Sequence, residues 1–480
     1  MGDRGASVRK GRSTAKCGVD DAGSPELGLS RRELLRRAGA GAVAIGLGGT
    51  GARTAYAFSG PHRFTKRQLA HHLEIAQWAH VVPGYDAWLD GTYARQWGER
   101  NDAEVTVDHV NSTELSARAA AEIDAGSGHD LFQLLSPPAV FESHTIPLDD
   151  AVEETTRRLG PISGVAHRST YNPRTRHSFG FPDFYAPDPI VWRHDLWSGI
   201  GRSPGTWDDV LEAAPSLRSR GHPVGIGMSN GPESTLASLA VAFCFGAAIQ
   251  DEAGEVRIDS KATRDYLGFV ASLYRRGMTS EVFGWNPASN NQFLYSGTGS
   301  LILNPISATR AAEELELPFA HALRLGPVPR GPAQRIAPAH TTGVYVIWKF
   351  SRQKELAKRY LIDQQVAYRE HLARSRLYNL PAWPGAIEGG FAGIAAIAAA
   401  DPHGPRGRYA GLAAIAERHT TNTGHPGCSN AAVCEIVDSS LIPRMAAHVA
   451  QGKLSAGEAA RAAGRQFEAV FEKWRDQKLV

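Results

Sequence analysis

The chain has 480 residues but only four cysteines, and it contains no uninterrupted run of the ~20 apolar residues that a membrane-spanning helix requires. It also has no H-E-x-x-H, clustered C-x-x-C or calcium-loop pattern. No nucleotide-binding glycine loop follows a predicted strand. These absences argue against a disulfide scaffold, a membrane anchor, a metal site and a nucleotide cofactor, so we expect neither metal nor cofactor.

Most of the chain also lacks an excess of charge of one sign. The whole sequence has 52 Lys and Arg against 49 Asp and Glu. Ten of the basic and five of the acidic residues lie within residues 1–57, so the remainder holds 42 and 44, and the formal charge changes from +3 to −2. A near-neutral chain lacks the basic surface that nucleic acid or an anionic membrane would require.

The first 57 residues have the three parts of a twin-arginine export signal. Arg31 and Arg32 precede a glycine-diluted apolar stretch over residues 38–52, and the small-residue site Ala55-Tyr56-Ala57 follows. We therefore predict cleavage after Ala57. No cysteine follows the apolar stretch where a lipid could be attached, so we expect a mature protein that is soluble outside the cytoplasm, in the periplasm or an equivalent space.

The cysteines that remain after residue 57 are few. Cys244 lies in an apolar run and is read as a buried small hydrophobic residue. Cys428 and Cys434 are six residues apart in a polar segment, which in an exported protein predicts a local disulfide, with two free thiols as the alternative.

Strand and helix patterns alternate along the chain after residue 66. Strands are predicted over 73–79, 104–110 and 130–135, with helical spacing over 86–100 and 114–125 between them. The alternation returns in three later strand–helix pairs, over 224–228 with 233–248, 299–303 with 307–316, and 343–348 with 352–374. This cadence predicts an α/β fold with parallel, doubly wound sheets, and the 423 residues after position 57 exceed a single core, so we expect two lobes.

One motif admits an enzymatic interpretation. Gly227-Met228-Ser229-Asn230-Gly231 fits the G-x-S-x-G nucleophile elbow and follows a predicted strand. However, no oxyanion-hole segment precedes it, and Pro232 suits an ordinary strand-to-helix turn. A serine hydrolase using Ser229 is therefore the alternative, and a non-catalytic protein is the main expectation.

Aromatic and amide residues recur where predicted strands end. Aromatic rings stack on the C–H faces of sugars, and amides and carboxylates bond their hydroxyls. In open α/β sheets, ligands bind at the carboxyl ends of strands. The predicted strand ends and turns include Trp78-Ala79-His80, residues 83–86 and 181–185, Trp285-Asn286, Asn290-Asn291, Asn304-Pro305 and residues 378–383.

The order of these segments resembles the extracellular solute-binding proteins of ABC importers, the family that includes sugar-binding proteins. The segments that carry the resemblance are Trp78 with Pro83-Gly84-Tyr85, Gly128–Phe132, Pro204–Val210, Phe245–Ala248, Asp251–Val256, Gly284-Trp285-Asn286 with Asn290-Asn291, Gly297–Asn304, and Gly343–Phe350 running into Lys354–Ala357.

The resemblance implies two lobes, each a doubly wound sheet flanked by helices, joined by hinge strands around a ligand cleft. Lobe one would take 58–182 and 322–372 and lobe two 188–318 and 375–480, with crossings near 183–189, 323–329 and Arg374. The implied ligand contacts are His80, Tyr85, Asp86, Ser136, Asp183, Phe184, Tyr185, Asn230, Trp285, Asn286, Asn304 and Trp383.

The resemblance further implies that the protein acts as a monomer, captures a solute and delivers it to an ABC permease in the cytoplasmic membrane. Ile306-Ser307 stands where maltose binders carry a stacking tryptophan, so a monosaccharide, polyol or other small solute fits better than a long maltodextrin. A binding protein that signals to a chemoreceptor is a further alternative.

Overall fold

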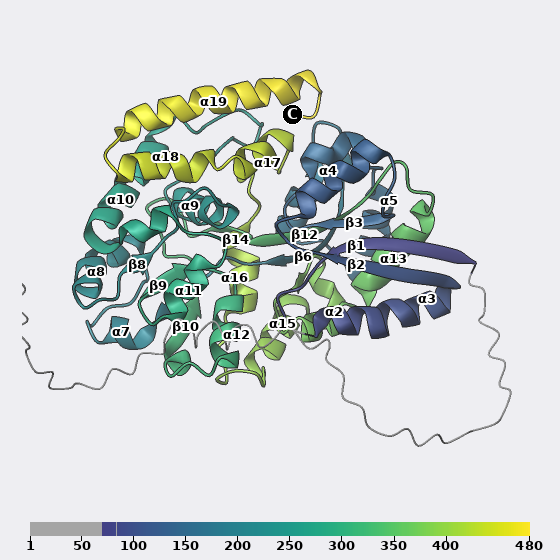
Figure 1. Cartoon of the computed structure of the whole chain (residues 1–480), viewed down its shortest axis with the longest axis horizontal. Coiled ribbons are helices and arrows are strands. Elements are labelled where there is room, and N and C mark those ends of the chain that lie inside the picture. Colours follow the sequence, from purple (N-terminus) through teal and green to yellow (C-terminus); the bar gives the residue numbers. More distant parts are fainter. Residues whose placement is uncertain (1–69, 83) are drawn as a thin grey trace, which may run out of the picture. The chain divides into compact units, whose positions relative to one another are not determined.

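The structure is a computed structural model, and it describes residues 70–82 and 84–480. The export signal predicted within residues 1–57 lies outside these residues. Two main sheets organise the described part, and in Figure 1 the six-stranded one lies on the right and the four-stranded one on the left.

The larger sheet has the strand order β13-β6-β12-β3-β1-β2. Its strands are β1 (His71–Trp78), β2 (Ala103–Val110), β3 (Leu131–Leu134), β6 (Phe181–Ala186), β12 (Thr341–Ile347) and β13 (Leu380–Pro381). β1 is parallel to both β2 and β3, whereas β12 is antiparallel to β3 and β6, and β13 is antiparallel to β6. The prediction of a purely parallel sheet is therefore wrong, because strands from distant parts of the chain insert in the opposite direction.

Both faces of this sheet are buried, as the pattern along single strands shows. In β1, Leu73 and Ile75 join one apolar cluster and Ala76 and Trp78 join another. Successive strand residues point to opposite faces of the sheet. Apolar residues at both odd and even positions therefore require other elements to pack on each face. The helices and turns of this half are α2 (Tyr85–Trp88), the π-helix η1 (Leu89–Ala94), α3 (Arg95–Asn101), α4 (Leu115–Ala125), η2 (Ala139–His144), α5 (Asp149–Leu159), α6 (Gly164–Thr170), α13 (Lys354–Val366), α14 (Tyr368–Arg374), η5 (Pro384–Ala386), α15 (Gly390–Ala399) and α16 (Leu412–Arg418).

The smaller sheet has the order β10-β7-β9-β8, and its central pair β7 and β9 is antiparallel. Its strands are β7 (Ile190–Arg193), β8 (Val224–Gly225), β9 (Leu301–Leu303) and β10 (Leu323–Gly326). The helices of this half are α7 (His194–Ser198), α8 (Trp207–Ser219), α9 (Pro232–Cys244), α10 (Lys261–Gly277), η3 (Ser280–Phe283), α11 (Ser289–Tyr295), α12 (Ser307–Glu314), η4 (Ala320–Ala322), α17 (Ala431–Asp438), α18 (Leu441–Ala450) and α19 (Ala456–Asp476).

Local sequence signals explain where these helices begin. Thr206 and Asp209 form a reciprocal capping box at the start of α8, and Ser455 and Glu458 form another at α19. Ser260 caps α10, which ends at Gly277 as its sequence predicts.

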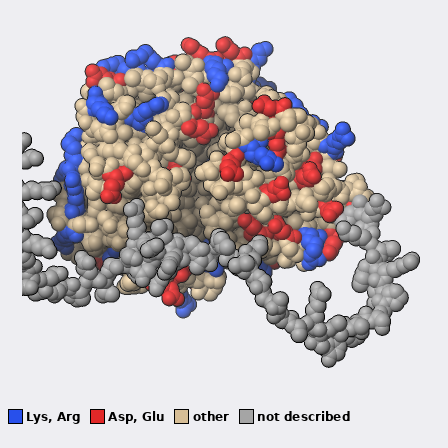
Figure 2. All heavy atoms as spheres, viewed as in Figure 1, with Lys and Arg blue, Asp and Glu red and all other residues tan. Residues whose placement is uncertain are grey.

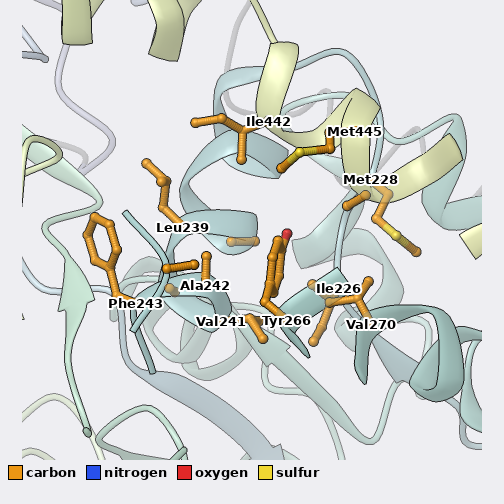
Figure 3. Close-up of a cluster of buried hydrophobic side chains, with 14 of the residues drawn as sticks. Ile226, Met228, Leu239, Val241, Ala242, Phe243, Tyr266, Val270, Ile442 and Met445 are labelled. Carbon is orange, nitrogen blue, oxygen red and sulfur yellow. The ribbon is translucent and has the colours of Figure 1, made fainter. Parts of the chain in front are cut away.

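The core of the smaller half combines aliphatic and aromatic side chains. Figure 3 shows side chains from the segment after β8, from α9, α10 and α18 converging on one another. They include Ile226, Met228, Leu239, Phe243, Tyr266, Val270, Ile442 and Met445. The yellow helices α17–α19 thus complete the core of the smaller half although they come last in the chain (Figure 1).

The chain passes between the sheets more than once. It leaves the larger sheet at Ala186, enters the smaller one at Ile190, and returns between Gly326 and Thr341. A short parallel pair, β11 (Ala337–Pro338) with β14 (Thr420–Thr421), lies on the return path, and a small hairpin joins β4 (Tyr171–Asn172) to β5 (His177–Ser178).

The prediction that residues after 375 belong to the second lobe is wrong for its first part. β13 pairs with β6, and Leu380, Ile394 and Leu412 belong to a core cluster of the larger half. The chain therefore joins the smaller half only after Thr421, about 45 residues later than the crossing predicted near Arg374.

Within the described residues, no helix combines the length and the apolar composition needed to cross a bilayer.

Candidate functional site

A cleft of about 380 Å³ is lined by residues of both halves. The loops after β2 and β3 supply one wall, and the first turn of α9 with Pro287 supplies the other. The beginning of β12 and the last turn of α17 complete it. The cleft therefore lies where several strands and helices end, which is the usual position of ligands in open α/β sheets.

Hydroxyl groups are the commonest polar feature of this cleft. The hydroxyl-bearing residues in its lining are Ser112, Thr113, Ser116, Ser136, Thr341, Thr342 and Thr423. A hydroxyl both donates and accepts hydrogen bonds, so such a lining suits a polar solute that does the same.

Two carboxylates and one imidazole line the same cleft, from Glu233, Asp438 and His340. The His340 imidazole lies 3.1 Å from a carboxylate oxygen of Asp188. Burial disfavours the imidazolium, but the carboxylates of Asp188 and Glu233 outweigh this effect, so the pKa of His340 is raised. Solvent reaches Asp438, yet the walls shield it enough to raise its pKa to about 6.

A much smaller pocket, of about 10 Å³, lies beside Trp285 and shares Glu233 with the cleft. The indole is half-buried, and its ring centroid is 5.2 Å from that of Phe293. It packs against β8, where a Cβ at Gly225 would stand 2.6 Å from the Trp285 ring. Gly225 is therefore required for this close approach.

Ser229 lines the small pocket, and its hydroxyl is already bonded. Its Oγ donates to the carbonyl oxygen of Trp285 at 2.6 Å and lies 3.0 Å from Oγ of Ser234. A serine nucleophile would instead pass its proton to a base. The geometry thus gives Ser229 a role in fixing the segment that carries Trp285.

Some predicted ligand residues do come together at these cavities. Ser136 lines the cleft, and Trp285 and Asn286 line the small pocket. Asn230 is exposed between lining residues of the two. Asn304 is buried behind them, where its Oδ1 accepts a 2.6 Å bond from Asn290.

The predicted residues after β1 form a network of their own away from the cleft lining. The backbone N–H of His80 donates to Asp86, and Nε2 of His80 lies 3.0 Å from Oδ1 of Asn379. Burial lowers the pKa of His80 to about 4, which keeps its ring neutral. Tyr85 is buried, with its hydroxyl 2.9 Å from Nδ1 of His371.

Asp183 is a buried core residue instead of a ligand contact. Gln133 donates to its carboxylate at 2.9 Å, and Gln364 and Gln365 donate at 3.3 and 3.2 Å. Burial raises the pKa of Asp183 to about 7 despite the bonds from Tyr368 and Gln133. Its neighbours Phe184 and Tyr185 are buried too.

The prediction that Trp383 contacts the ligand is wrong. Its side chain is 0% exposed, its ring centroid is 5.1 Å from that of Phe181, and Nε1 donates to Thr156 Oγ1 at 3.0 Å. Trp383 therefore belongs to the core of the larger half.

The predicted disulfide is wrong as well, because Cys428 and Cys434 are free thiols. Cys434 lies in the first turn of α17, and its thiol donates to the carbonyl of Pro137 at 3.1 Å. Cys428 precedes that helix in the loop, where its carbonyl accepts from Gln250. Helix α17 thus turns one thiol toward the cleft wall and away from the other.

Much of the cleft lining comes from residues that were not predicted from the sequence. Ser112 and Thr113 follow β2 directly, so the rule about strand ends could have found them. Glu233 had only the signal of an acid in a first helical turn, and Asp438 and His340 had none. Among residues 70–82 and 84–480, no group of three or more His, Cys, Asp or Glu is placed to hold a metal ion.

The family model described as bacterial extracellular solute-binding protein matches residues 83–362, more than half of the chain. The chain belongs to this family. Binding a solute outside the cytoplasm is therefore the function that the family shows, and the resemblance seen in the sequence is confirmed.

Solved structures of such proteins share the two-lobed fold. Maltose-bound MalE3 of T. maritima is 19% identical, with a TM-score of 0.67 over 84% of this chain and 100% of that one. A sugar transporter of Arthrobacter chlorophenolicus with bound laminaribiose is 14% identical, with a TM-score of 0.66 over 83% and 98%.

A solute-binding protein of Agrobacterium radiobacter in complex with ribitol is 14% identical, with a TM-score of 0.65 over 84% of this chain and 99% of that one. No curated protein matches the chain.

Proposed function

We propose that this protein captures a small sugar or polyol in the cleft between its two sheets and delivers it to an ABC permease. The observation that carries the proposal is a cavity of about 380 Å³ whose lining is rich in serine and threonine hydroxyls and comes from both halves. Structural neighbours with bound maltose, laminaribiose and ribitol support a polyhydroxylated solute.

Recognition would proceed by closure of the two lobes. A solute that touches Ser136 on one wall and Glu233 on the other gains contacts from both lobes, so it binds the closed state more tightly. We assign the hinge to the three passages between the sheets, at residues 187–189, 327–340 and 422–430.

The protein would work outside the cytoplasm, as a soluble monomer released from its twin-arginine signal. Residues 31, 32, 55 and 57 are the positions on which export and cleavage would depend. We further propose that it is not catalytic, because the Ser229 proton is bonded to a backbone carbonyl instead of a base.

A thermal-shift screen of sugars, polyols and amino acids tests the proposed solute class. A ligand at 100 times its Kd adds ~2.7 kcal/mol to the native state, so a true solute raises the melting temperature clearly. Small-angle scattering with the best ligand should show a smaller radius of gyration. A chain that responds to amino acids and to no sugar or polyol would overturn the proposal.

A further inference from the structure

Charge distinguishes the cleft from an ordinary hydroxyl-lined pocket. Its lining contains Glu233 and Asp438 but, among the described residues, no Lys or Arg. Even a protonated His340 only balances its partner Asp188 and leaves the other two carboxylates uncompensated. The cleft therefore holds a negative potential, which desolvated walls strengthen.

Neither carboxylate has a hydrogen-bond or ion-pair partner among the described residues, unlike Asp188 with His340 or Asp209 with Thr206. Both line the cleft, where Glu233 is half-buried and Asp438 is exposed to solvent. Their lone pairs are thus available to a ligand.

Glu233 and Asp438 lie at opposite ends of their helices. Glu233 lies in the first turn of α9, where the helix dipole stabilises an acid, so that residue has an ordinary structural explanation. Asp438 is the last residue of α17, where the dipole disfavours a negative charge. Its place in the fold is electrostatically unfavourable, which points to a role in binding instead of stability.

On the face in Figure 2, Lys and Arg gather along one outer edge, and Asp and Glu are spread over both halves. The cleft combines a volume of about 380 Å³, hydroxyl side chains and two carboxylates that have no partner among the described residues.

We propose that the solute carries an amino group, so that the cleft prefers an amino sugar or a comparable cationic polyol over neutral and anionic sugars. The ammonium would donate to Glu233 and Asp438, and the hydroxyls would bond the serines and threonines around them. This inference rests on the proposed function, because it assigns a charge to the solute of the same cleft.

The test is a calorimetric series on the full mature protein with neutral, amino and acidic forms of the same sugars. The probes are glucose, galactose and mannose with their 2-amino and uronic acid counterparts, together with cellobiose and the disaccharide of glucosamine. An amino form should bind about tenfold or more tightly than its neutral counterpart, and its affinity should fall with salt.

Two variants and a control locate the effect. Asp438→Asn and Glu233→Gln should each remove most of the preference for the amino form, while the exposed Glu472→Gln on α19 should keep it. Melting curves confirm that each variant folds. If Glu233→Gln lowers only the melting temperature, its carboxylate serves the helix and the proposal is wrong for that residue.

The outcomes are distinct for the two proposals. Equal or tighter binding of neutral or acidic sugars overturns the charge preference and leaves the sugar-binding function in place. If no member of the series and no other sugar or polyol binds, the proposed function fails and the charge preference fails with it.

Discussion

The two halves of the molecule place the same residue types in opposite environments. In the larger half, Tyr85 after β1, Asp183 within β6 and Trp383 after β13 are all buried. In the smaller half, Trp285 and Asn286 lie at the rim of the cavities. An aromatic or amide residue at a strand end or turn can therefore belong either to a core or to a binding surface. Which of the two it joins depends on whether other elements of the fold pack over it.

The cores differ for the same reason. The larger half has a polar centre in which Gln133, Gln364 and Gln365 surround Asp183. The smaller half packs apolar side chains, aliphatic and aromatic, from four chain segments (Figure 3). A hydrogen-bonded centre fixes side-chain positions, whereas an apolar one tolerates repacking, so mutations should have unlike consequences in the two halves.

The largest expected effect is on Trp383. Trp383→Ala should lower the free energy of unfolding by ~3–5 kcal/mol, because it leaves a cavity beside Phe181 and removes the partner of Thr156. Denaturant melts measure the loss, and Trp383→Phe should recover part of it. A stable alanine variant with weakened ligand binding would instead show that Trp383 contacts the ligand.

Asp183 should make the stability of the protein depend on pH. Because burial raises its pKa to about 7, the folded protein binds the proton more tightly than the unfolded chain, whose Asp pKa is ~3.9. The folded state therefore loses stability as pH rises from about 4 to about 7, by a few kcal/mol, and the loss is complete above that range.

Unfolding free energies measured from pH 4 to pH 8 should show this decline in wild type and a smaller one in Asp183→Asn. The exposed Asp124→Asn serves as the control and should keep the wild-type slope. Parallel curves for all three proteins would mean that Asp183 is ionised in the fold at little cost.

A substitution at Trp285 should affect ligand binding more than stability, in contrast to one at Trp383. Trp285→Ala should weaken binding of the identified solute by ~2 kcal/mol or more, with a smaller loss of stability than at Trp383. Calorimetry beside denaturant melts separates the two quantities. Trp192, a half-buried tryptophan on β7 that lines neither the cleft nor the small pocket, is the matched control, and its alanine variant should keep wild-type affinity. If Trp285→Ala also keeps wild-type affinity, Trp285 is a core residue like Trp383.

The smallest effect should be at Ser229. Ser229→Ala removes the bond to the Trp285 carbonyl, which should lower stability by ~1 kcal/mol and leave affinity close to wild type. The wild-type protein should show no covalent labelling by a fluorophosphonate probe. Stoichiometric labelling at Ser229 would instead establish an activated nucleophile.

Local patterns predicted the elements of the fold well. The strands near 73–79, 104–110 and 130–135 and the helices capped at Thr206 and Ser260 are all present. These features depend on neighbouring residues, through side-chain periodicity and capping bonds. Two lobes followed from chain length and from the resemblance, and the fold comparisons bear them out.

Features that depend on distant partners were predicted less well. The direction of β12 and the docking of β13 are set by pairing with strands far away in the sequence, which periodicity does not report. The same limit applies to the site. Ser136 was found through the family resemblance and Trp285 also through its place among the predicted strand ends and turns, but Asp438 reaches the cleft only because α17 folds back over the smaller half.

The position of β12 has a consequence for the order in which the protein can be assembled. β12 lies between β3 and β6, so residues 341–347 must arrive before these two strands share a sheet. During synthesis, the first 340 residues therefore emerge with β3 and β6 each lacking a neighbour, and their exposed edges invite pairing with other chains. Completion of the larger sheet must therefore wait for the last third of the chain, which supplies β12 and β13.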